Sequence, residues 1–111
     1  EKNYQCYMRN VTNDTWKPNI DENSLVSNYC YPMIVSDREK LCNTLASESI
    51  ETRPLIAGSM ALQPFHIKKY GNHHLPNAER VHKNGLYLPN YHNLKEEEIE
   101  YISTVVNRII G

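Results

Sequence analysis

Arg53 is the residue of this sequence whose type and position most clearly require a binding partner. It stands within a short apolar strand pattern, Ile50 to Ala57, which leads into the turn-forming pair Gly58-Ser59. A guanidinium stays charged, so inside a strand it needs an anionic or carbonyl partner. That partner is either a bound ligand or a carboxylate of the same chain, unless the side chain points into solvent at a sheet edge. The residues alone leave these alternatives open.

The histidines could supply imidazole ligands, but their spacing does not fit a metal site. The adjacent pair His73-His74 cannot face one ion from a regular element without distortion, and no pair has the H-E-x-x-H spacing. Loop histidines at a surface are the simpler interpretation, and we expect no metal site. The chain has five histidines: His66, His73, His74, His82 and His92.

The sequence also lacks the patterns that build a nucleophilic or phosphate-binding site. It has no G-x-S-x-G and no glycine-rich phosphate loop, and it contains only four glycines. Cys42 falls on the inner face of a predicted helix, where a thiol is usually inert. Glu96 to Glu98 suit the first turn of a helix better than acid–base chemistry. We therefore expect no catalytic residue in this chain.

Length and composition indicate one ordinary globular domain. The chain has 111 residues, and 12 Lys+Arg against 13 Asp+Glu give a net charge of -1. This balance leaves no electrostatic footprint for nucleic acid, and no apolar run reaches the roughly 20 residues that a membrane span needs. Three widely spaced cysteines, Cys6, Cys30 and Cys42, favour reduced and mostly buried thiols in a cytoplasmic protein.

In the first half of the chain, the pattern predicts a helix, a strand, a second helix and a second strand. Tyr4, Tyr7, Met8 and Val11 have helical spacing. A loop follows, containing Asn13-Asp14, and we expect Trp16 to pack it down. The predicted elements are a helix from residue 1 to about 10, a strand at 27–35, a helix from 37 to about 47 and a strand at 50–57. Pro32 places the first strand at an edge, and Ser36 with Glu39 forms a capping box for the second helix.

In the second half, we expect an irregular segment and then three further elements. Pro64 and Gly71 interrupt the segment from 60 to 75. Asn77 is the predicted N-cap of a short helix, and Gly85 its left-handed stop. A strand at 85–89 and a helix at 94–110 closed by Gly111 complete the chain. Few strands and helices on one face predict an α+β fold, a two-layer sandwich of a small mixed sheet with helices.

Several of these motifs together resemble one known family. Ile50-Glu51-Thr52-Arg53-Pro54, Ala57-Gly58-Ser59 and Gln63-Pro64-Phe65 resemble, in order and spacing, the C-terminal region of the DegT/DnrJ/EryC1/StrS family of pyridoxal-phosphate (PLP)-dependent sugar aminotransferases. The strand around Tyr31, the Leu75-Pro76-Asn77 segment, the Leu86-Tyr87-Leu88-Pro89 strand and the last helix are similar to the family as well. The resemblance covers essentially the whole chain.

The resemblance implies that residues 1–111 form a single C-terminal small domain, like that of fold-type-I PLP enzymes. Residues 1–12 would be the connector helix and residues 27–111 the α+β core, while the large PLP-binding domain is absent. The implied partners are that large domain of the same polypeptide and a nucleotide-sugar substrate, in a homodimeric parent enzyme. The cofactor PLP would belong to the parent, whose large domain carries the catalytic lysine or histidine, and is not expected to bind this chain alone.

By the same resemblance, the substrate contacts come from one strand and the loop after it. The candidates are Arg53, Ser59, Ala61 and Gln63. Many aminotransferases of the family have a histidine where this chain has Ala61, and Ala57-Gly58-Ser59 is similar to the A-G-N variant of the sugar 3-dehydratase branch. A 3-dehydratase domain is therefore one alternative function. A non-enzymatic α+β binding module is the other.

Overall fold

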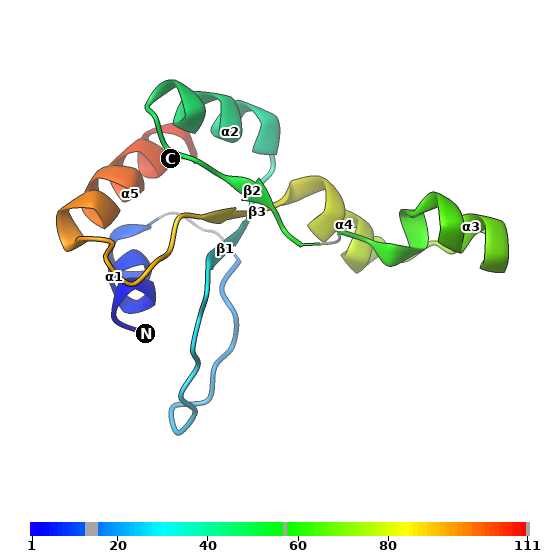
Figure 1. The fold of residues 1–111 in the computed structure, drawn as a ribbon, viewed down its shortest axis with the longest axis horizontal. Coiled ribbons are helices and arrows are strands. Elements are labelled where there is room, and N and C mark those ends of the chain that lie inside the picture. The colour runs from blue at the N-terminus through cyan, green and yellow to red at the C-terminus, as the bar shows by residue number, and fades with distance from the viewer. Residues whose placement is uncertain (13–15, 57, 111) are drawn as a thin grey trace.

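The computed structural model of the 111-residue chain describes residues 1–12, 16–56 and 58–110. Helices cover one side of a small sheet, and two projections extend away from this body (Figure 1). One projection is the arm, residues 56 and 58–84, and the other is the loop from 16 to 30. In chain order the elements are α1 (Lys2–Asn10), β1 (Tyr31–Ile34), α2 (Arg38–Ser47), β2 (Arg53–Pro54), the 3-10 helix η1 (Met60–Leu62), α3 (Pro64–Tyr70), α4 (Pro76–Asn84), β3 (Gly85–Leu88) and α5 (Glu96–Ile110).

The sheet has the order β1-β3-β2, and both of its ladders are antiparallel. The α+β class is as predicted, but the pairing differs from the mixed pairing that we expected. Strands β1 and β2 flank the crossover helix α2 and run in the same direction, yet they do not pair with each other. Strand β3 comes later in the chain and inserts between them, so every neighbouring pair is antiparallel.

The core lies between the inner face of the sheet and the helices α1, α2 and α5. Side chains alternate along a strand, so Tyr31, Met33, Leu86 and Leu88 point inward and are buried. Tyr7 of α1 is 0 % exposed, stacks on Tyr31 at 4.7 Å between ring centroids, and donates a hydrogen bond to the Pro89 carbonyl at 2.7 Å. The first and last helices pack together, as predicted. Ile99, Ile102 and Val106 of α5 supply its buried face.

Several predictions for the first half of the chain need correction. The N-cap of α2 is Asp37, whose carboxylate accepts from the Lys40 amide at 3.1 Å, and not Ser36. The Ser36 carbonyl instead accepts from the Asn84 side chain, which holds this residue outside the helix. Trp16 is 45 % exposed and does not anchor the loop. The expected loop residues Asn13-Asp14 lie outside the described part of the chain.

Both N-terminal strands are shorter than their patterns suggested. β1 begins at Tyr31 rather than Ser27, and β2 consists of Arg53–Pro54 alone. Only the residues opposite the four-residue strand β3 find a ladder partner, so apolar residues beyond it cannot pair. Pro32 lies on the edge strand, as predicted.

In the second half, the segment from 60 to 75 is more helical than expected. Pro64 occupies the first turn of α3, where its missing N–H costs nothing, and so it starts a helix instead of interrupting one. Helix α4 begins at Pro76, without the predicted Asn77 cap. Gly85 has an extended backbone, not a left-handed one, because it is the first residue of β3. A side chain there would collide with Leu55 and the Val81 carbonyl. The expected stop at Gly111 lies outside the described residues.

Candidate functional site

Arg53 lies at the edge of the sheet, on its outer face, with its side chain 65 % exposed. Its Nε and Nη2 donate to Glu51 Oε1 at 3.1 and 2.7 Å. Of the alternatives that the sequence left open, the structure therefore shows an exposed side chain with a carboxylate partner from its own chain. Exposed ion pairs contribute little to stability, so Glu51 can be replaced by another anion at small cost.

A shallow hollow of about 260 Å³ lies beside Arg53. Strand register explains part of its wall, because Pro32, Tyr87 and Arg53 are direct cross-strand neighbours on the outer face. The other wall comes from the segment that follows β3. The lining residues are Glu51, Thr52, Arg53, Tyr87, Pro89, Asn90 and Tyr91. A guanidinium beside two phenol rings can bind an anionic, ring-containing ligand by charge and by stacking.

The segment after β3 is held firmly to the body of the protein. Asn90 Oδ1 accepts from Asn3 Nδ2 at 3.0 Å, and Asn90 Nδ2 donates to the Asn28 carbonyl at 2.9 Å. Tyr29 meets the Tyr87 ring edge-on at 6.3 Å between centroids. The hollow is therefore supported from α1 and from the loop before β1, and its walls are preformed.

Sequence reasoning missed Tyr87, Asn90 and Tyr91 as residues of this hollow. For Tyr87 a signal was present, because alternation along β3 places it on the face opposite Leu86 and Leu88. For Asn90 and Tyr91 there was none, since they follow Pro89 in an irregular segment whose path depends on contacts with α1.

The other sequence-predicted contacts lie in the loop at the base of the arm. Ser59 and Ala61 are buried, with 2 % and 5 % exposure, and Gln63 is half-buried. Ser59 Oγ has no hydrogen-bond partner among the described residues. The side chains of Ser59 and Ala61 therefore pack inside the loop, and only Arg53 and Gln63 of the four candidates reach the surface. Ala57, part of the Ala57-Gly58-Ser59 motif, lies outside the described residues.

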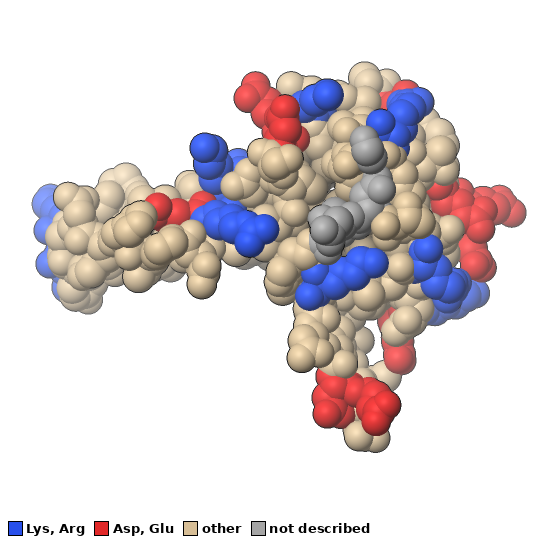
Figure 2. Space-filling model, turned by 180° about the vertical axis from the view of Figure 1, so that it is seen from behind, with Lys and Arg blue, Asp and Glu red and all other residues tan. Residues whose placement is uncertain are grey.

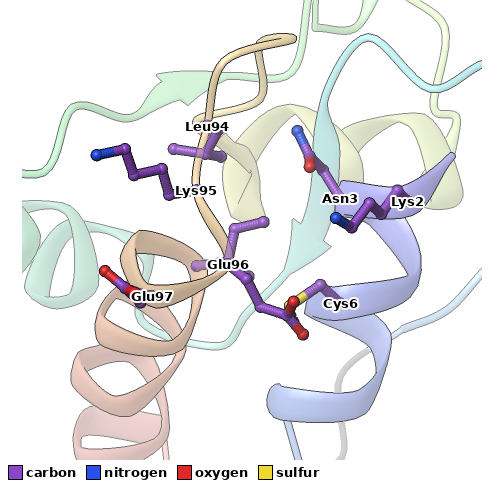
Figure 3. A pocket seen from close by; sticks show the side chains of 8 residues that line it. Lys2, Asn3, Cys6, Leu94, Lys95, Glu96 and Glu97 are labelled. Atoms are coloured by element: carbon purple, nitrogen blue, oxygen red, sulfur yellow. Dashed lines mark hydrogen bonds between the residues drawn. The ribbon is translucent and has the colours of Figure 1, made fainter.

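A second hollow lies between the N-terminal ends of α1 and α5 and has a volume of about 300 Å³ (Figure 3). Cys6 and Glu96 point toward each other there, with 3.9 Å between Sγ and Oε1. Cys6 is 2 % exposed, so its thiol is closed to a substrate. All three cysteines are free, and Cys30 is buried while Cys42 is half-buried. This agrees with the predicted reduced, mostly buried thiols.

The described residues contain no cluster of three or more His, Cys, Asp or Glu side chains that could hold a metal ion. Within the same residues, no helix is both long enough and apolar enough to cross a bilayer.

Comparison with solved structures shows where this fold occurs. A DegT DnrJ EryC1 StrS aminotransferase from Brucella abortus superimposes with a TM-score of 0.85 at 20% identity, over 99% of this chain and 30% of that chain. The E. coli GDP-4-keto-6-deoxy-D-mannose-3-dehydratase with bound hydrated PLP gives a TM-score of 0.76 at 24% identity, over 95% of this chain and 29% of that chain. Both likenesses establish the fold.

Comparison of sequences gives the same relationship. GDP-perosamine synthase of Escherichia coli O157:H7 is 37% identical over 71 residues, which make up 64% of this chain and 19% of that protein. This chain thus spans about a fifth of the length of that relative. Residues 1–107, nearly the full length of this chain, match the sequence profile of the DegT/DnrJ/EryC1/StrS aminotransferase family. The chain therefore belongs to the DegT/DnrJ/EryC1/StrS aminotransferase family.

Proposed function

We propose that this chain is the C-terminal small domain of a PLP-dependent aminotransferase that acts on a nucleotide-linked keto-sugar in amino- or deoxy-sugar biosynthesis. The observation that carries the proposal is the family match over residues 1–107, together with the fold shared with a complete aminotransferase. The parent enzyme would be a cytoplasmic homodimer. Its product would serve polysaccharide, lipopolysaccharide or glycan synthesis.

PLP does not fit the residues of this chain by itself. The cofactor needs a lysine that can form a Schiff base in a shielded site, and a carboxylate for the pyridine nitrogen. All seven lysines here lie exposed at the surface: Lys2, Lys17, Lys40, Lys68, Lys69, Lys83 and Lys95. We therefore assign the cofactor and the catalytic residue to the large domain of the parent.

Within the parent, the part of Arg53 is to bind and orient the substrate. Its ion pair with Glu51 is exposed on both sides, so a substrate anion can take the place of the carboxylate. Tyr87 and Tyr91 in the same hollow offer ring faces to the ligand. Gln63 would add a side-chain contact from the loop. Ser59 and Ala61 are buried and would act by fixing the path of that loop.

The large domain would dock against the arm. Helix α3 has no buried residue, although its whole length is described, and the arm exposes large apolar side chains in water. Figure 2 shows an arm surface that is mostly uncharged, with basic side chains at its far end. An exposed apolar surface of this kind is typical of a protein interface. The exposed residues are Ile56, Met60, Leu62, Phe65, Tyr70 and Leu75.

A sugar 3-dehydratase is the second candidate. The observation in its favour is the Ala57-Gly58-Ser59 motif, which is similar to the A-G-N variant of the dehydratase branch. Ala61 also stands where many aminotransferases of the family have a histidine. One of the solved structures with this fold is such a dehydratase. The two functions differ in their product, an amino sugar or a 3-deoxy sugar.

The test is steady-state kinetics of the parent enzyme with a GDP-linked 4-keto-6-deoxy sugar and glutamate. We expect Arg53→Ala to raise the KM for the GDP-linked sugar about tenfold or more with kcat nearly unchanged, because a charge-assisted contact of about 1.5–3 kcal/mol is lost. Arg9→Ala is the matched control, because Arg9 has a similarly exposed side chain (63 %) paired with the carboxylate of Glu96 and lies outside both the hollow and the arm; it should change neither constant. Equal kinetics for the two variants would remove Arg53 from the site. Product analysis separates transamination from dehydration.

A further inference from the structure

The turn at the base of the arm rests on the imidazole of His82. The Ser59 N–H donates to His82 Nδ1 at 3.0 Å, a contact that bridges 23 positions of the chain. Gly58 has a left-handed backbone with φ +56, and a Cβ at this position would collide with the His82 ring. Glycine is thus needed here for both conformation and close approach. The turn and the ring are fitted to each other.

Helix α4, which bears His82, is fixed to the body of the protein. His82 lies in the last turn of α4, and its carbonyl accepts from Arg38 Nη1 at 2.9 Å. The same guanidinium nitrogen donates to the Gly85 carbonyl at 3.0 Å, which joins the end of α4 to the start of β3. Asn84 Nδ2 also donates to the Ser36 carbonyl at 3.1 Å. The ring therefore presents its Nδ1 from a rigid support.

The side chains of Ser59 and Ala61 do not hold the loop in this way. Ser59 Oγ is buried without a hydrogen-bond partner among the described residues, and Ala61 offers no polar group. The loop's own backbone closes the short helix η1, through Leu62 N to the Ser59 carbonyl at 3.2 Å. The Ser59 amide on His82 is thus a polar tie between this loop and α4.

We propose that His82 is a positioning residue: its neutral imidazole, with the proton on Nε2, holds the Ser59 amide and so sets the position of the loop from 59 to 63. The inference deepens the proposed function and rests on it for the loop's contact with substrate. An imidazolium has hydrogens on both nitrogens and cannot accept a bond. A protonated His82 therefore cannot hold the Ser59 amide, and the loop would lose this tie.

The charged groups around His82 are few in the described part of the chain. From α2 comes the guanidinium of Arg38, which binds the His82 carbonyl. Helix α4 itself carries Arg80 and Lys83, and Glu79, whose carboxylate lies 3.1 Å from His74 Nδ1. Strands β1 and β3 offer only Tyr31 and Tyr87, and the segment from 58 to 63 offers no ionisable side chain. Among these contacts, no carboxylate binds the His82 ring.

The first test is nitrogen-15 NMR of the imidazoles in this chain at neutral pH. We expect His82 to have a protonated Nε2 and an acceptor-type Nδ1, and we expect the hydrogen bond to shift the Ser59 amide proton downfield. The Ser59 protection factor should fall about fivefold or more when His82 is protonated. A proton on Nδ1 at neutral pH, or a protection factor that ignores the titration, would overturn the proposal. Neither readout involves PLP, substrate or activity. The hydrogen bond between Ser59 and His82 can therefore be confirmed or rejected even if the proposed function is wrong.

Two variants complete the test. His82→Asn keeps an acceptor at the position of Nδ1 but cannot titrate, so Ser59 should stay protected at both pH values. His82→Leu removes the acceptor, and protection should be low at both. His92→Asn changes an exposed histidine and should behave as the unaltered chain. If His82→Asn and His82→Leu lower the protection factor equally, the side chain acts only through packing and the tie is rejected.

Discussion

At the scale of single residues, Glu48 shows how one carboxylate couples the end of α2 to α5. The Tyr101 hydroxyl donates to it at 2.8 Å and Arg108 Nη2 at 2.9 Å. These two hydrogen bonds, the Tyr101 bond first, lower the pKa of Glu48 below its ordinary value of 4.5. A depressed folded pKa stabilises the protein above the unfolded pKa, and the stabilisation is lost as the pH falls through the folded pKa.

We therefore predict that the chain loses stability in acid partly through Glu48. The urea concentration at the unfolding midpoint, measured from pH 7 down to pH 3, should decrease once the pH is below about 4.5. Glu48→Gln should make this decrease less steep. Glu22→Gln, an exposed residue of the loop from 16 to 30, is the control and should leave the slope unchanged. A steep acid loss that persists in Glu48→Gln would assign it to other carboxylates.

The candidate site was only partly predictable at this scale. Arg53 stood out because a cation inside an apolar strand pattern is unusual, and its exposed place beside Glu51 was among the alternatives. The burial of Ser59 and the part of His82 were not predictable. Both depend on contacts between residues 23 positions apart, and no local spacing encodes such a contact.

At the scale of elements, the start of α2 offers a sharp test of capping. Asp37 accepts from the Lys40 amide, while Ser36 lies outside the helix. We expect Asp37→Ala to lower the free energy of unfolding by about 1 kcal/mol, because the helix loses its cap. Ser36→Ala should change it by less than about 0.5 kcal/mol. Urea unfolding of the two variants is the measurement. A larger loss of unfolding free energy in Ser36→Ala than in Asp37→Ala would show that Ser36 is the cap.

The same scale shows which elements a sequence pattern can predict. Helices α1 and α5 and strand β3 have a clear helical or alternating period, and they lie close to where the pattern put them. Strand β2 shrank to two residues because its length is set by β3, its partner. Helix α3 was missed because Pro64 can either break a helix or begin one. Only the surrounding chain decides between these outcomes.

At the scale of the whole molecule, the two projections make the chain more extended than a compact domain. Its radius of gyration is 15.4 Å, against about 13 Å expected for a compact domain of this length. The arm extends from the body in Figure 1, and Met60 and Phe65 are 51% and 61% exposed. Apolar side chains in such positions contribute little to the stability of this chain alone. These side chains would contribute to stability only where a second domain or protein covers them.

The exposed apolar side chains of the arm should therefore affect stability differently in this chain and in the proposed parent enzyme. In the isolated chain, Met60→Ser and Phe65→Ser should change the free energy of unfolding by less than about 0.5 kcal/mol each. In the parent, where the large domain would cover the arm, each should cost about 1.5–3 kcal/mol. Urea unfolding of both proteins measures the difference.

The matched control is Leu25→Ser in the loop from 16 to 30, because Leu25 is 78% exposed but lies outside the arm. An equal loss for Leu25→Ser in the parent would mean that the effect is not specific to the arm. Sedimentation of the isolated chain decides between partners. If the chain forms a dimer that Met60→Ser and Phe65→Ser abolish, the arm binds a second copy and not the large domain. If the chain is a monomer at all concentrations and the loss of unfolding free energy occurs only in the parent, the result agrees with docking of the large domain. The apolar surface of the arm is then buried only in the parent, by that domain.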